Sequence, residues 1–84
     1  MDMLGRRTLM EKFADLIKRD AAILAKLESM DNGRVFGEAF GDAMGCWNSI
    51  KYFAGWVDKI HGETLPVSGS QFAFTKEHPV GVCG

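Results

Sequence analysis

Two cysteines and two histidines are the first residues of this 84-residue chain to consider as a nucleophile, a base or a metal ligand. Cys46, His61, His78 and Cys83 are too scattered for a recognisable zinc pattern, since such ligands cluster at short spacing. A nucleophilic cysteine needs a neighbouring base and an oxyanion site, and neither follows from the residues around Cys46 or Cys83. The sequence therefore predicts that both cysteines are small packing residues.

The histidines and acids also favour structural roles. His61 lies at the expected end of a helix, where a cation is favourable against the helix dipole, and we prefer this to a general base or metal ligand. His78 precedes a proline and should be extended and partly exposed. Glu38 and Asp42 have helical spacing, at which like charges repel weakly and remain solvated. Residues 81–84 are too short for a phosphate-binding glycine loop. The sequence predicts no catalytic, cofactor-binding or metal-binding residue.

The composition is that of a small globular protein, with 46% apolar and 25% charged residues. A formal net charge of −1 gives no footprint for nucleic acid or an anionic membrane. No apolar run approaches the ~18 residues that span a bilayer. A chain this short buries only about 60–65% of its unfolded surface, so we expect marginal stability without a partner. Two reduced thiols are a simpler interpretation than a disulfide.

The first half should be helical. From Thr8 to Met30, apolar residues recur at steps of three and four, which predicts an amphipathic helix. Asp20 is a good N-cap for a second helix beginning at Ala21, so we expect two helices in line or one kinked helix. The run should end at residues 31–33, because Asn and Gly tolerate the left-handed conformation of a C-cap.

A further helix is predicted over residues 35–60. It is apolar over so much of its surface that we expect burial on more than one side. Gly37, Gly41 and Gly45 recur every fourth residue on one flank. Each costs about 1 kcal/mol relative to Ala in a helix interior. Close approach of another backbone is the expected compensation.

The C-terminal part has the pattern of β-structure. Thr64–Leu65 with Val67, and residues 71–76, predict a hairpin whose turn is residues 68–70. Pro79–Gly84 has the character of the first half of a buried strand. Because an unfinished strand leaves backbone groups unpaired, we expect the chain to be part of a larger protein.

Several of these segments together resemble the aldehyde dehydrogenase superfamily, in order and spacing, over about residues 4 to 84. They are Arg6–Met10, Phe13–Ile17, Leu27–Gly33, Tyr52–Lys59 with Gly62, and Pro79–Gly84. One departure is Glu77-His78-Pro79, where the family's usual acid before the proline is displaced by one place.

The resemblance implies an α/β enzyme that oxidises aldehydes to carboxylic acids with NAD or NADP, in the cytoplasm or the mitochondrial matrix. It implies that residues 1–61 are the helical part of the cofactor-binding domain and residues 62–78 a strand excursion toward the oligomerisation sheet. Sister subunits would then contact about Gly62–Glu77. Residues 79–84 would begin the dinucleotide-binding sheet, and the helix around Asp42–Cys46 would border the substrate entrance.

The family's nucleophilic cysteine and glutamate base match no residue of this sequence, so Cys83 is not the nucleophile. We expect the chain alone to be inactive, to bind no cofactor and to form a loose helical state. The alternative is an independent small helical module for interaction or assembly.

Overall fold

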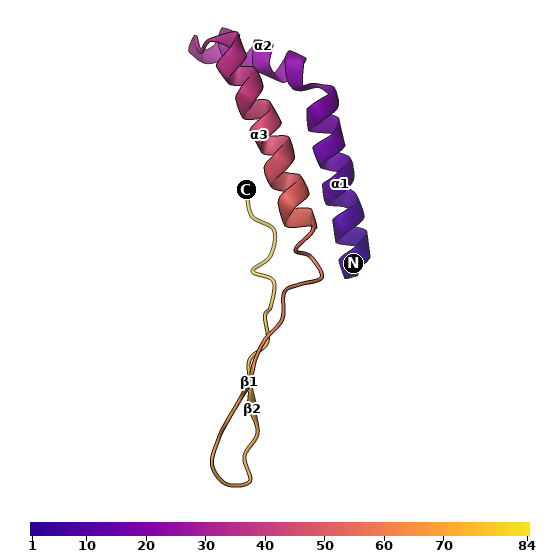
Figure 1. Cartoon of the computed structure of the whole chain (residues 1–84), viewed down its shortest axis with the longest axis vertical. Coiled ribbons are helices and arrows are strands. Elements are labelled where there is room, and N and C mark those ends of the chain that lie inside the picture. Colours follow the sequence, from indigo (N-terminus) through magenta and orange to yellow (C-terminus); the bar gives the residue numbers. More distant parts are fainter.

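The computed structural model describes residues 1–84 as three helices followed by a thin two-stranded arm (Figure 1). The helices are α1 (Met3–Arg19), α2 (Ala21–Asn32) and α3 (Phe36–Ala54), and the strands are β1 (Thr64–Leu65) and β2 (Ala73–Phe74). The chain measures 64 × 24 × 19 Å and has a radius of gyration of 19.3 Å, against about 12 Å for a compact domain of this length. The predicted helical character and hairpin are confirmed, but the chain is elongated.

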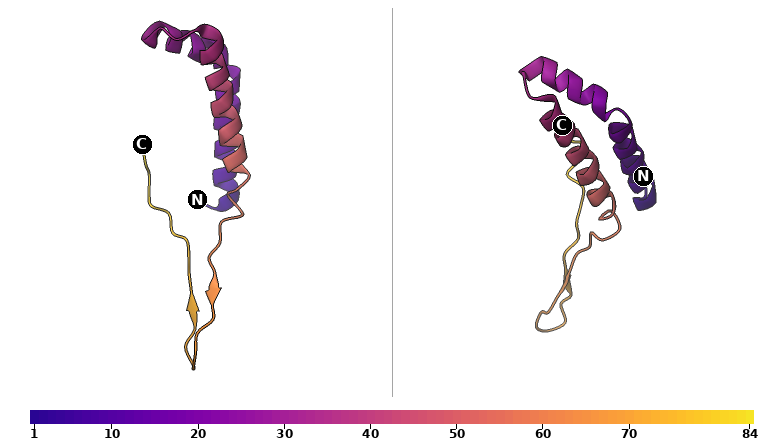
Figure 2. Two further views of the ribbon diagram at one scale, coloured as in Figure 1. Left: turned by 60° about the vertical axis from the view of Figure 1, so that its left-hand side comes forward. Right: turned by 45° about the horizontal axis from the view of Figure 1, so that its top comes forward.

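The first two helices separate at Asp20, as predicted. The carboxylate of Asp20 accepts hydrogen bonds of 3.0 and 2.9 Å from the Arg19 guanidinium and does not cap α2. The hydrogen bond from Arg19 lowers the pKa of Asp20. Figures 1 and 2 show α2 turning sharply away from α1 at this point, so the in-line arrangement and the side-chain cap are both wrong. At the other end of α2, the predicted C-cap is confirmed, since Gly33 has φ 76°.

The third helix is shorter than predicted. It ends at Ala54, and the backbone N–H of Gly55 bonds to the carbonyls of both Lys51 and Tyr52. Bonds between residues three apart continue to Lys59, so the chain tightens into turns instead of extending the α-helix to residue 60. His61 is therefore not at a helix end. It lies exposed beyond these turns, with Nδ1 3.0 Å from the carbonyl oxygen of Gly62.

Small residues make the contact between helices. In every view α1 and α3 run side by side, and α2 crosses one end of the pair. The five buried residues are all alanines: Ala14, Ala21, Ala25, Ala39 and Ala54. Around them, Lys51 Nζ lies 3.1 Å from the Asp15 carboxylate, and Lys18 Nζ lies 4.4 Å from the centre of the Trp47 ring. Alanine allows close helix packing, but it contributes little apolar area to a core.

Much apolar surface remains exposed. The chain exposes 6979 Å², about 2,000 Å² more than a folded monomer of 9.3 kDa is expected to expose. The predicted burial of the third helix on more than one side is therefore wrong for this chain. The predicted packing of Cys46 and Cys83 is wrong too, since both are exposed. Both thiols are free, as predicted.

The arm is an antiparallel hairpin in which Thr64 pairs with Phe74 and Leu65 with Ala73. On the side of this pairing that faces the helices, the backbone N–H of Thr75 donates to the carbonyl oxygen of Glu63, and the backbone N–H of Glu63 donates to Thr75 Oγ1, each at 2.8 Å. The hairpin is confirmed, although its strands are only two residues long.

Residues 79–84 do not form the predicted buried strand. No strand is assigned to them, and Val80 and Val82 are fully exposed. A strand needs neighbours for its backbone groups, and none lies beside this segment. None of the three helices combines the length and apolar character that crossing a bilayer requires.

Candidate functional site

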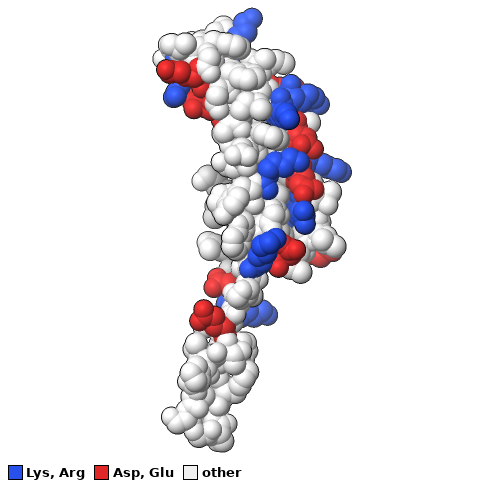
Figure 3. Space-filling view, viewed as in Figure 1, with Lys and Arg blue, Asp and Glu red and all other residues white.

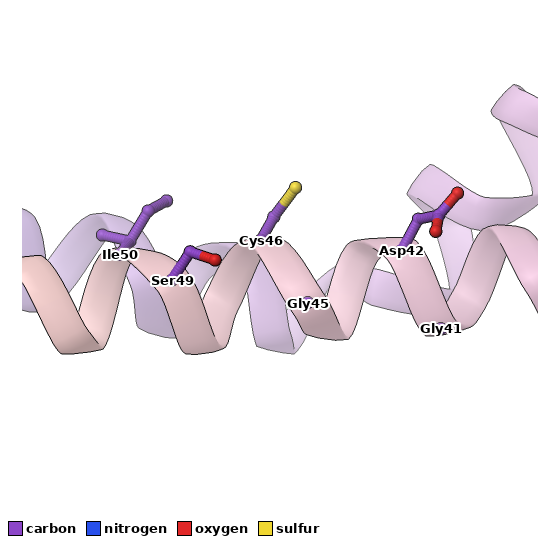
Figure 4. Close-up of a pocket in the computed structure, with 6 residues that line it drawn as sticks. All are labelled: Gly41, Asp42, Gly45, Cys46, Ser49 and Ile50. Carbon is purple, nitrogen blue, oxygen red and sulfur yellow. The ribbon is translucent and has the colours of Figure 1, made fainter.

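A groove on α3 is formed by the predicted glycine flank. Its lining is Gly41, Asp42, Gly45, Cys46, Ser49 and Ile50, around a volume of about 530 Å³. Figure 4 shows the Asp42, Cys46 and Ile50 side chains along the same side of the helix. An added Cβ at Gly37, Gly41 or Gly45 would meet no atom within 4 Å. The expected close approach of another backbone is therefore absent from this chain, and the flank is open.

The α3 groove has no acid–base pair. Cys46 is accompanied by one titratable residue, Asp42, and that carboxylate lies 3.1 Å from Arg34 Nη2. The same guanidinium approaches Glu38 at 3.7 Å. Glu38 and Asp42 are therefore a pair of acids bridged by one cation, and their side chains remain 65% and 57% exposed, which agrees with the prediction of solvated surface charges. Asp42 is tied to this ion pair, so it does not serve as a base for Cys46.

A second concavity joins three parts of the chain that lie far apart in the sequence. We call it the aromatic groove, and its volume is about 680 Å³. Its lining comes from the first half of α1, the end of α3 with the turns that follow it, and the segment beyond β2: Met3, Arg6, Met10, Phe53, Trp56, Val57, Ile60, His61, Gly62, Lys76, Glu77, His78 and Pro79. Its lining combines apolar residues with charged residues of both signs.

The aromatic groove brings His61 and His78 into one site, which sequence reasoning missed. His78 is exposed and outside regular structure, as predicted. The aromatic run from Tyr52 to Trp56 was the available signal, but it was assigned to a buried helix face. Neither cysteine lines this groove, and no group of three or more His, Cys, Asp and Glu residues is placed to hold a metal ion. Both grooves therefore offer surfaces for packing without a nucleophile and base in contact.

The chain also forms no dinucleotide cradle of its own. Such a cradle uses a strand, a glycine-rich turn and the N-terminus of the following helix. Here the three helices all precede the two strands, so neither β1 nor β2 leads into a helix. We therefore assign no step that involves a nicotinamide cofactor to the residues described.

Comparison with known proteins shows which family the chain resembles. Residues 1–84 match the model of the aldehyde dehydrogenase family along their whole length. The chain belongs to this family. It is 51% identical to retinal dehydrogenase 2 of Taeniopygia guttata, 49% to retinal dehydrogenase 2 of Homo sapiens and 47% to aldehyde dehydrogenase 1A1 of Mus musculus. Each match covers 100% of this aldehyde dehydrogenase chain and 16% or 17% of the relative.

Proposed function

We propose that this chain is the helical and hairpin part of an NAD(P)-dependent aldehyde dehydrogenase, and that it supplies scaffold rather than reacting groups. The observation that carries the proposal is the match over every residue, at 47–51% identity to the three relatives. In this proposal residues 1–61 belong to the cofactor-binding domain. Residues 62–78 join the oligomerisation sheet, and residues 79–84 enter the dinucleotide-binding sheet.

The uncovered surfaces support such a role. An excess of about 2,000 Å² over a folded monomer is the area of a large interface. Val80 and Val82 suit a strand with neighbours on both faces, yet they are 95% and 106% exposed. The open glycine flank of α3 is suited to a closely packed backbone. Covering these three surfaces with further polypeptide would restore the burial that their residue types predict.

The arm supports the assignment to an oligomerisation sheet. It projects well beyond the helices (Figure 1), and Figure 3 shows no charged atoms over its far end, which agrees with the absence of charged residues from 64 to 75. Phe72 and Phe74 are 74% and 62% exposed. A two-stranded hairpin is marginally stable alone, and its open edges are a template for added strands. We therefore propose that sister subunits contact the arm through about Gly62–Glu77.

The contribution of the chain to catalysis is positional. No nucleophile–base pair and no dinucleotide cradle occur within residues 1–84, so the thiolate chemistry and hydride transfer of the family fall to other parts of the enzyme. The alternative of an independent interaction module has no observation that favours it. We expect no turnover when the 84-residue chain is assayed alone with an aldehyde and NAD, and steady NADH formation would contradict the scaffold role.

A chimera gives the direct test. The 85 residues of human retinal dehydrogenase 2 that match this chain are replaced by residues 1–84, and oxidation of an aldehyde is followed through NADH absorbance. We expect a folded, oligomeric and active chimera. A matched chimera carrying Gly41→Leu should lose assembly or activity, because its side chain occupies the open flank. A folded chimera that binds NAD but does not turn over would overturn the proposal.

A further inference from the structure

One irregular pair of residues closes the base of the arm. The register of the hairpin places Glu63 opposite Thr75, next to the Thr64–Phe74 pair. In a regular antiparallel ladder, a hydrogen-bonded pair exchanges two bonds between backbone groups. Here the N–H of Thr75 donates to the carbonyl oxygen of Glu63, but the N–H of Glu63 donates to Thr75 Oγ1. A side-chain hydroxyl therefore takes the place of the Thr75 carbonyl where the ladder ends.

The outgoing limb of the arm (residues 61–65) and the returning limb (residues 73–79) also approach closely at this pair. An added Cβ at Gly62 would overlap the carbonyl oxygen of Thr75 and would lie 3.2 Å from Lys76 Cα. At no other glycine would a Cβ come within 4 Å of backbone that is distant in the sequence. The Thr75 carbonyl thus lies against Gly62, and the hydroxyl of the same residue satisfies the N–H of Glu63.

Packing against the helices does not set the direction of the arm. Neither strand contacts a helix, and Figures 1 and 2 show both strands lying beyond the ends of the helices. In Figure 2 the two limbs diverge above the strands, one toward α3 and the other toward the C-terminus. Gly62 and Lys76 line the aromatic groove, so the residues next to the irregular pair already belong to the helical end. The direction of the arm is therefore decided at residues 62–63 and 75–76.

We propose that Thr75 is a positioning residue for subunit contact: its hydroxyl ends the ladder and, together with Gly62, fixes the direction in which the arm leaves the helices. This inference rests on the proposed function, because the arm must meet a sister subunit in one orientation. Thr75→Val keeps the β-branched shape and strand propensity of the residue but removes the hydroxyl. The N–H of Glu63 then loses its partner or moves to the Thr75 carbonyl, and either change releases the two limbs.

The distance between two spin labels tests this positioning in the 84-residue chain. One label is attached to Cys46, which is exposed on α3, and the other to a Ser70→Cys side chain at the tip of the arm, with Cys83→Ser removing the other thiol. We expect one narrow distance distribution. Thr75→Val should broaden it or shift its centre, and Thr75→Ser should restore it. Thr64→Val is the matched control, because Thr64 is an exposed threonine of β1 whose hydroxyl bonds to no residue of the chain.

The chimera with human retinal dehydrogenase 2 tests the consequence for assembly. There Thr75→Val should raise the dissociation constant between subunits about fivefold, as expected for the net loss of one hydrogen bond. Thr75→Ser and Thr64→Val should leave the constant unchanged. Sedimentation velocity over a concentration series measures the constant, and far-UV circular dichroism establishes that the helix content is the same in each variant.

The outcomes separate this inference from the proposed function. An assembled chimera with the same dissociation constant before and after Thr75→Val would overturn the positioning role and leave the scaffold role standing. A folded chimera that does not assemble with any of these residues would overturn both. The positioning role also fails if the label distances are as broad in the unchanged chain as in Thr75→Val. Equal effects of Thr64→Val and Thr75→Val would overturn it as well, because they would show a general weakening of the hairpin.

Discussion

The helices and the arm differ in how they satisfy their backbone. Each helix closes its backbone hydrogen bonds within itself. Side-chain contacts add to these: one ion pair on α1, one at the start of α3, and an ion pair and a cation–π contact between α1 and α3. The arm depends on two paired residues in each strand and on the Glu63–Thr75 bonds. Local hydrogen bonding lets a helix form beside one neighbour, whereas a strand needs partners on both edges.

The same difference extends to burial. Helix contact covers five alanines completely, while no residue of the arm or of residues 79–84 is buried. We therefore expect the helical region and the arm to respond separately to substitution, and the following variants test that separation.

Gly62→Ala should have the largest effect, confined to the arm. An added Cβ at Gly62 would overlap the carbonyl oxygen of Thr75, so the base of the hairpin must open. We expect complete loss of hydrogen-exchange protection at Thr75 N, with the thermal transition of the helices unchanged. A lower helical melting temperature in this variant would show that the two regions are coupled.

Ala14→Leu should destabilise the helical region by about 1–3 kcal/mol, because extra methylenes are forced into a filled contact. Ala14 is fully buried between α1 and α3. Ala22→Leu is the control, since Ala22 is exposed on α2. Thermal denaturation followed by circular dichroism measures both, and equal effects would show that the alanine contact does not hold the helices together.

Gly41→Ala should stabilise the isolated chain by about 1 kcal/mol, because Gly41 is interior to α3 with open space around it. Gly33→Ala should destabilise it by a similar amount, since φ 76° strains a residue with a Cβ. In the chimera with retinal dehydrogenase 2, Gly41→Ala should become destabilising if a backbone packs on the flank. Stabilisation in both settings would argue against that packing.

Arg34→Ala should have the smallest effect, below about 1 kcal/mol, because the side chains of Arg34, Glu38 and Asp42 are all partly exposed. Its loss leaves two acids at spacing where they repel. Denaturant unfolding at low salt should detect the change, and high salt should remove it. A salt-independent loss would indicate that Arg34 acts through the packing of its aliphatic side chain and not through charge.

Local chemistry explains which predictions succeeded. The break at Asp20, the left-handed Gly33 and the hairpin of residues 64–74 depend on neighbours in the sequence, so pattern alone located them. The predicted burial of α3, Cys46 and Val82 failed because burial requires atoms that lie far away in the sequence, and residues 1–84 place none there. His61 was misplaced for a related reason, since continued periodicity beyond Ala54 hid the change to turns.

The two candidate sites also differ in whether neighbours in the sequence are enough to locate them. The spacing of residues along the sequence was enough to identify the glycine flank with Asp42 and Cys46, because every residue that lines the α3 groove lies on that one helix. The aromatic groove could not be identified in this way, because residues 3–10, 53–62 and 76–79 meet only after the hairpin returns the chain to the end of α3.

The sequence by itself determined the family, the helical and strand segments and the lack of a recognisable catalytic pattern, since each follows from residue types at short range. Tertiary structure alone decided the sharp turn of α2, the alanine contact between α1 and α3 and the joining of His61 with His78 in one groove. These features depend on which surfaces meet in space, and in this chain the surfaces that meet are small while the large apolar ones remain uncovered.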